Sequence, residues 1–124
     1  MARTFTIGTV AKLGGVSVDT VRFYERRGVL PAPLRRASGY REYSDATVER
    51  IRFTKALQEL GFRLDDVKLV LSDVDTGTAT CAREQPRFDA VLARLDARIE
   101  ELLRMRGKLR ATLRRCRDGR CTLR

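Results

Sequence analysis

An apolar residue recurs every three or four positions through the last third of this 124-residue chain. The repeat predicts one long helix that buries an apolar seam against a second helix, as in a coiled coil. Its seam positions are Phe88, Leu92, Leu95, Ile99, Leu102, Leu109 and Leu113, with Arg106 at one further position. A helix of this kind cannot bury its seam alone, so we predict a homodimer.

The three cysteines of the chain lie at the two ends of this seam. The register extends backwards to Cys81 and forwards to Cys116, 35 residues later, and Cys121 follows. Because 35 helical residues span about 52 Å, Cys81 and Cys116 of one chain cannot share a ligand. A parallel pair would join each cysteine to its own copy, whereas an antiparallel pair joins Cys81 of one chain to Cys116 and Cys121 of the other. We favour the antiparallel pair, which forms two three-sulfur sites. The alternative is that the cysteines bind no ligand and serve only as small apolar residues.

Three thiolates in a chain without histidine favour a soft metal ion. A structural zinc site normally needs four ligands, so a three-sulfur set suits mercury(II), lead(II) or cadmium(II). Basic side chains near the last two cysteines favour thiolate over thiol, and they are also candidates for contacts with DNA phosphates or for solvation. These are Arg114, Arg115, Arg117 and Arg120. Pro86 cannot lie deep in a helix, so we expect Cys81 just before the helix or in a distorted first turn.

The first 30 residues predict two short helices joined by a glycine-containing turn, which is the pattern of a helix-turn-helix. Thr6 and Ser17 each precede apolar residues at helical spacing, as helix caps do. Gly14 and Gly15 end the first predicted helix, and Gly28 ends the second.

Residues 31–43 predict a β-hairpin, because two prolines exclude a helix and a Ser-Gly pair lies between two short extended segments. Arginine and tyrosine on its flanks suit contacts with DNA phosphate and sugar, so we interpret it as a wing. Ser44 is predicted to cap a third helix over residues 46–60. A fourth helix opens at Arg63, with Val67, Val70 and Leu71 facing inward.

The net charge of +10 points to a polyanionic partner, with nucleic acid ahead of a membrane surface. Residues 1–55 carry +6 and residues 104–124 carry +8, whereas the residues between them carry −4.

No apolar run approaches the roughly 20 residues of a membrane span. An odd cysteine count without an export signal indicates a reduced, cytoplasmic compartment. An enzyme is disfavoured, because the chain has no histidine, phosphate loop or nucleotide fingerprint.

Several motifs in order along residues 5–71 resemble the MerR family of transcription regulators. They are the string Ile7-Gly8-Thr9-Val10-Ala11, the segment 16–30 around Val21-Arg22-Phe23-Tyr24-Glu25, the segment Ser38-Gly39-Tyr40-Arg41-Glu42-Tyr43, and the segment Leu60-Gly61-Phe62-Arg63-Leu64-Asp65-Asp66. The resemblance implies a dimer on a pseudo-palindromic, double-stranded operator. It also implies DNA contacts from Thr20, Arg22 and Tyr24 on the recognition helix and from Arg35, Tyr40 and Arg41 on the wing. Val21, Phe23 and Phe62 are interpreted as core residues.

The cysteines also resemble those of metal-sensing family members, in which one precedes the dimerisation helix and two follow it. Cys81, Cys116 and Cys121 match these positions, most closely those of mercury(II) regulators. The resemblance therefore favours mercury(II), with cadmium(II), lead(II) or zinc(II) as alternatives. The resemblance implies an activator that distorts the DNA of a heavy-metal resistance promoter so that RNA polymerase engages. A thiol-redox sensor with a Cys116–Cys121 disulfide and an architectural DNA-binding protein are the alternatives.

These observations predict a mainly α-helical protein, with a winged helix-turn-helix domain followed by a long antiparallel coiled-coil helix. The expected boundaries are 1–75 for the DNA-binding domain, 76–80 for a hinge, 81–116 for the dimerisation helix and 117–124 for a metal-binding loop and tail.

Overall fold

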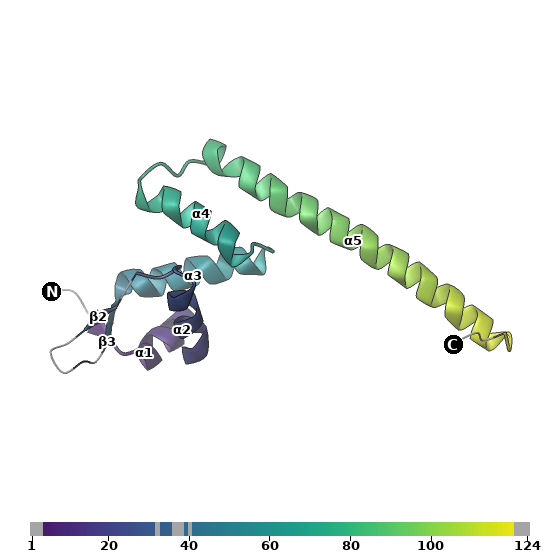
Figure 1. The fold of residues 1–124 in the computed structure, drawn as a ribbon, viewed down its shortest axis with the longest axis horizontal. Coiled ribbons are helices and arrows are strands. Elements are labelled where there is room, and N and C mark those ends of the chain that lie inside the picture. Colours follow the sequence, from purple (N-terminus) through teal and green to yellow (C-terminus); the bar gives the residue numbers. More distant parts are fainter. Residues whose placement is uncertain (1–3, 32, 36–38, 40, 121–124) are drawn as a thin grey trace. The chain divides into compact units, whose positions relative to one another are not determined.

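Three short strands and four helices precede one helix of 37 residues in the computed structural model (Figure 1). The structure describes residues 4–31, 33–35, 39 and 41–120, and for Leu34 and Arg35 it describes the backbone only. The chain forms two compact units, residues 1–84 and 85–124. The elements are β1 (Thr4–Phe5), α1 (Ile7–Gly14), α2 (Val18–Arg26), β2 (Leu34–Arg35), β3 (Arg41–Ser44), α3 (Asp45–Glu59), α4 (Leu64–Asp75) and α5 (Cys81–Arg117).

Helices α1 and α2 begin at the residues that their sequence signals predict. The Oγ1 of Thr6 accepts a hydrogen bond from the backbone N–H of Thr9 at 3.3 Å, and Ser17 Oγ accepts one from Thr20 at 3.1 Å. Gly15 follows α1 with a positive φ of 72°, which glycine adopts without steric cost. The predicted helix-turn-helix is confirmed.

The predicted hairpin of the wing is present as β2 and β3, which pair Leu34 with Glu42 and Arg35 with Arg41. The other edge of β3 pairs antiparallel with β1, a two-residue strand that the sequence did not predict. β1 is too short to show the alternation of polar and apolar residues by which a strand is recognised. Wing residues 36–38 and 40 lie outside the described residues.

Helices α3 and α4 supply much of the core of the first unit. Ile51 is fully buried, and Val67, Val70 and Leu71 are buried as predicted. α3 begins one residue earlier than predicted, at Asp45. Ser44 holds the cap position, but among the described atoms its side chain accepts no cap hydrogen bond. The prediction that Ser44 is the cap residue of α3 is therefore confirmed in its position.

We expect Gly14→Ala to lower the free energy of unfolding by about 1–3 kcal/mol, the usual cost of overpacking a core. A Cβ at Gly14 would lie 2.5 Å from Cγ2 of Ile51, which is too close for two carbon atoms. Gly8→Ala, on the same helix with no atom near its added Cβ, is the matched control and leaves stability unchanged or slightly higher. Urea denaturation measures both. Equal stabilities of the two variants would contradict the close packing of Gly14 on Ile51.

Helix α5 begins at Cys81 and continues through Pro86. Of the two positions expected for Cys81, just before the helix or in its first turn, the structure shows the second. Pro86 lies in the second turn of α5, so its missing N–H removes one hydrogen bond near the start of the helix. In the single chain the seven seam side chains are 41–61% exposed. No helix within the described residues is long and apolar enough to cross a membrane.

Candidate nucleic-acid interface and cysteine positions

Helix α2, the predicted recognition helix, presents Arg22 at the surface. The Arg22 side chain is 54% exposed, and its pairing with Asp19 at 3.8 Å is loose and solvated. Thr20 is half-buried, and its hydroxyl shares a 2.9 Å hydrogen bond with Ser17 at the helix start. Arg22 is therefore free to reach an anionic partner, whereas the Thr20 hydroxyl also supports the cap.

Tyr24, predicted to contact DNA, lies in the core. Its side chain is almost completely buried, and its hydroxyl donates a 2.6 Å hydrogen bond to Oε1 of Gln58 on α3. Burial raises the pKa of the Tyr24 phenol above its ordinary value of 10. The hydroxyl is already used inside the protein, so this placement does not support Tyr24 as a DNA contact.

Phe23, interpreted as a core residue, is 38% exposed, so its sequence-based placement is also wrong. The guanidinium carbon of Arg27 lies 5.7 Å from the centre of its ring, and Arg27 also pairs with Asp65 at 3.0 Å. Val21 and Phe62, the other two predicted core residues of this group, are buried.

A single carboxylate joins the recognition helix to the wing. Glu25 on α2 is 13% exposed and accepts a hydrogen bond from Nη1 of Arg41 at 2.9 Å. The Tyr43 hydroxyl donates a second hydrogen bond to the same carboxylate. Burial raises the pKa of the Tyr43 phenol, and the hydrogen bond to Glu25 raises it further. The phenol therefore keeps the proton that it donates. The sequence analysis missed this role of Glu25. In the sequence, Glu25 is simply an acidic residue next to Arg26 and Arg27, and nothing local connects it to the wing.

A groove of about 760 Å³ lies between α2, the wing and the residues that lead into α1. Arg22, Arg26 and Arg41 line it, together with Glu25 and Glu42. Three arginines around an open groove suit a phosphate backbone, because guanidinium groups bind phosphate oxygens with two hydrogen bonds. Of the other predicted wing contacts, Arg35 is described only as backbone in β2, and Tyr40 lies outside the described residues.

The cysteines lie at opposite ends of α5. Cys81 is its first residue and is exposed, whereas Cys116 is its penultimate residue and is half-buried. Cys121 lies outside the described residues. Within the described part of one chain, no three cysteine, histidine, aspartate or glutamate side chains gather in a way that could hold a metal ion. The structure of one chain therefore does not bring Cys81 and Cys116 together.

The last turn of α5 is strongly basic, with Arg114, Arg115 and Arg117 around Cys116. Cations are stabilised at a helix C-terminus, where the carbonyl ends of the backbone dipoles carry negative charge. Arg120 beyond the helix pairs with Asp118 at 3.4 Å. The predicted basic surroundings of Cys116 are thus present on the helix itself.

Two protein-family descriptions match the chain. A model described as "MerR HTH family regulatory protein" covers residues 5–74, and one described as "MerR, DNA binding" covers residues 48–112. Together they span the winged helix-turn-helix and most of α5.

Similar proteins include a mercuric resistance operon regulatory protein of Bacillus cereus. It is 38% identical over 115 residues, which cover 90% of this chain and 85% of that protein. Among solved structures, PbrR691 of Ralstonia metallidurans CH34 in complex with lead(II) has a TM-score of 0.80 at 28% identity, covering 89% of this chain and 86% of that one. The regulator MerR of Bacillus megaterium MB1 in complex with mercury(II) has a TM-score of 0.65 at 33% identity, covering 90% and 86%.

Proposed function

Because the chain belongs to the MerR family of helix-turn-helix transcription regulators, we propose that it switches a promoter in response to a soft divalent metal ion bound by its cysteines. Its relatives are regulators rather than enzymes, and the arginine-lined groove of its winged helix-turn-helix suits operator DNA. The position of cysteines at the two ends of one long helix carries the metal part of the proposal.

The metal site requires two chains. Cys81 and Cys116 are 35 residues apart on one helix, or about 52 Å at 1.5 Å per residue. In an antiparallel dimer the two-fold axis passes near the midpoint between them, beside Ile99. Each end of the dimer then combines Cys81 of one chain with Cys116 and Cys121 of the other, which gives two sites.

Mercury(II) is the favoured ion. Three soft thiolates match mercury(II) better than zinc(II), which normally takes four ligands in a structural site. The arginines in the last turn of α5 offset the negative charge of a three-thiolate complex. The Bacillus relatives named for mercury and bound to mercury(II) support this choice. The lead(II) complex of PbrR691 keeps lead(II) as an alternative, together with cadmium(II) and zinc(II).

The response is a shift between two poses of the dimer on DNA. A metal ion that bridges the two chains stabilises one pose over the other, because only that pose brings the three sulfurs together. The operator follows the pose by bending and untwisting, and this deformation brings promoter elements into the register that RNA polymerase requires. We propose residues 76–80 as the connection between the DNA-binding domain and the dimerisation helix, and the exposed seam of α5 as the dimer interface.

A titration of the reduced dimer with mercury(II), lead(II), cadmium(II) and zinc(II), followed by thiolate–metal absorption, tests this function. We expect saturation at one mercury(II) ion per site, or two per dimer, and loss of the signal in Cys81→Ser. Ala82→Ser, in the same turn of α5, is the matched control and keeps the signal. A protein whose transcriptional output responds to an oxidant but to none of these ions would instead be a redox sensor.

For the wing, we expect Arg41→Ala to weaken operator binding by a similar factor on every operator sequence. Arg41 lines the groove, and we expect its guanidinium to contact phosphate rather than bases. The slope of log affinity against log salt concentration should therefore become shallower by about one unit. Fluorescence anisotropy at several salt concentrations measures this slope. Arg98→Ala, which removes an exposed arginine from α5, is the control. A loss of affinity confined to one operator sequence would indicate a base contact instead.

A further inference from the structure

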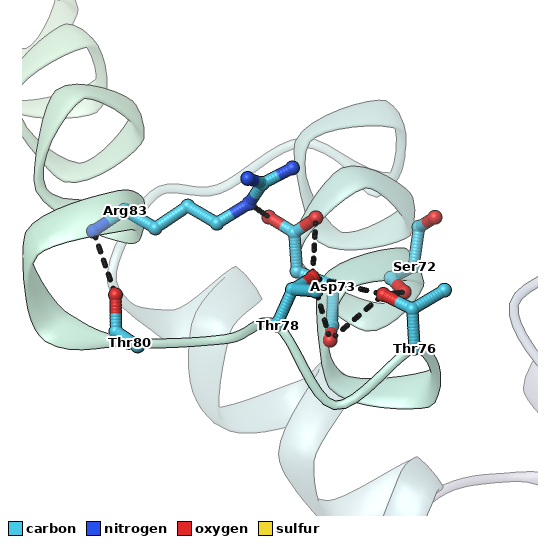
Figure 2. A network of polar contacts seen from close by, with 6 residues as sticks. All are labelled: Ser72, Asp73, Thr76, Thr78, Thr80 and Arg83. Atoms are coloured by element: carbon cyan, nitrogen blue, oxygen red, sulfur yellow. Dashed lines mark hydrogen bonds and ion pairs between the residues drawn. The ribbon is translucent and has the colours of Figure 1, made fainter.

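A nearly buried carboxylate connects the end of α4 to the beginning of α5 (Figure 2). The Asp73 side chain is only 8% exposed, and its Oδ2 lies 3.1 Å from Nε of Arg83 in the first turn of α5. Arg83 itself is 55% exposed. Since Cys81 begins the same turn, this ion pair anchors the helical turn that carries one of the three cysteines.

Hydrogen bonds also close the connection between these helices. The Asp73 carbonyl accepts from the backbone N–H groups of Thr78 at 2.9 Å and Ala79 at 3.1 Å. Thr80 then caps α5, because its Oγ1 accepts from the N–H of Arg83 at 3.1 Å (Figure 2). The segment predicted as a hinge is therefore a turn closed by hydrogen bonds between α4 and the start of α5.

The charges at the end of α4 link it to helices on both sides. Asp73 and Asp75 lie in its last turn, where backbone carbonyls disfavour negative charge, and α4 has no basic residue of its own there. The compensating cations come from other elements. Arg50 of α3 pairs with Asp75, and Arg83 of α5 pairs with Asp73. This turn of α4 thus connects α3, within the DNA-binding unit, to the start of α5.

We propose that Asp73 and Arg83 are positioning residues that couple metal occupancy at Cys81 to the pose of the DNA-binding unit. The proposal rests on the metal-sensing function above and adds the route by which the signal leaves the site. Neither residue binds metal or DNA in this scheme. Together they keep the first turn of α5 fixed to α4, so the metal-bound position of Cys81 specifies the position of α4 and, through Arg50, of α3.

The test measures mercury(II) affinity, in a competing thiol buffer, for the free dimer and for the dimer on operator DNA. The ratio of the two affinities is the coupling factor, which is independent of any uniform loss of affinity. We expect the wild-type factor to differ from one by about 5- to 150-fold, the usual range for allosteric coupling. Arg83→Gln should bring it to within about threefold of one while two mercury(II) ions still bind each dimer. Asp73→Asn should act in the same direction.

Three further variants separate coupling from a structural role. Arg83→Lys keeps the positive charge and should retain part of the coupling. The coupling factor of the double variant Asp73→Asn/Arg83→Gln should be no closer to one than that of Arg83→Gln alone, because both changes remove the same interaction. Arg98→Gln removes an arginine of similar exposure, 58%, from the same helix and should behave as wild type.

The outcomes identify which idea fails. A wild-type coupling factor in Arg83→Gln overturns this inference alone and leaves the metal-sensing proposal intact. Additive effects in the double variant also overturn it. A wild-type protein without thiolate–metal absorption contradicts the proposed function, and this inference with it.

Discussion

Homodimers of a Cys81→Ser chain and homodimers of a Cys116→Ser chain are each expected to lose their metal sites, whereas a heterodimer of the two chains regains one. Loss in the homodimers follows because two thiolates and a hydroxyl hold a soft ion far less well than three thiolates. Recovery in the heterodimer follows from antiparallel pairing. One of its sites combines the intact Cys81 of one chain with the intact Cys116 and Cys121 of the other.

The other site of that heterodimer holds both serines and stays empty. Heterodimers isolated with two different affinity tags should therefore bind one mercury(II) ion per dimer, against two for wild type. A parallel coiled coil pairs each cysteine with its own copy, so it predicts no intact site in the mixture. The matched control is a heterodimer of an Ala82→Ser chain with a wild-type chain, which keeps both sites. A mixed dimer that binds no metal would contradict the antiparallel arrangement.

The features of the fold that the sequence predicted are those decided by neighbouring residues. Thr6, Ser17 and Gly15 act within one turn of the helices that they begin or end, so their roles could be read from local order. The long helix α5 was predicted because its repeat extends over several heptads. β1 was missed because two residues carry no periodicity, and they become a strand only by pairing with β3.

The errors on α2 arise where two neighbouring aromatic residues compete for one core position. Helical periodicity alone does not decide whether Phe23 or Tyr24 faces inward. Gln58 on α3 supplies the hydrogen-bond acceptor that makes a buried tyrosine acceptable, and it is 34 residues away in sequence.

The polar connections of the candidate site could not be predicted for the same reason. Glu25 meets Arg41 across 16 residues, and Asp73 meets Arg83 across a turn whose shape depends on its own hydrogen bonds. The cysteine positions, by contrast, follow from the heptad register. The shared metal site that we propose for them requires a second chain.

A second large effect is expected from Ile99→Asp, which should dissociate the dimer and abolish operator binding. Ile99 is 54% exposed in the single chain and lies on the proposed seam near its midpoint, where an antiparallel two-fold axis brings its two copies close together. The change removes about 1.5–3 kcal/mol of apolar burial from each chain. It also places two like charges near each other in a desolvated interface.

We expect the dimer dissociation constant to rise at least about a thousandfold, which corresponds to roughly 4 kcal/mol. Analytical ultracentrifugation over a range of concentrations measures it, and circular dichroism reports whether the DNA-binding unit remains folded. Leu103→Asp is the matched control, because Leu103 is similarly exposed, at 49%, but lies outside the seam. A monomer presents one recognition helix to a two-fold operator, so the affinity for the operator should fall when the dimer dissociates. An Ile99→Asp protein that stays dimeric while Leu103→Asp dissociates would place the interface on a different face of α5.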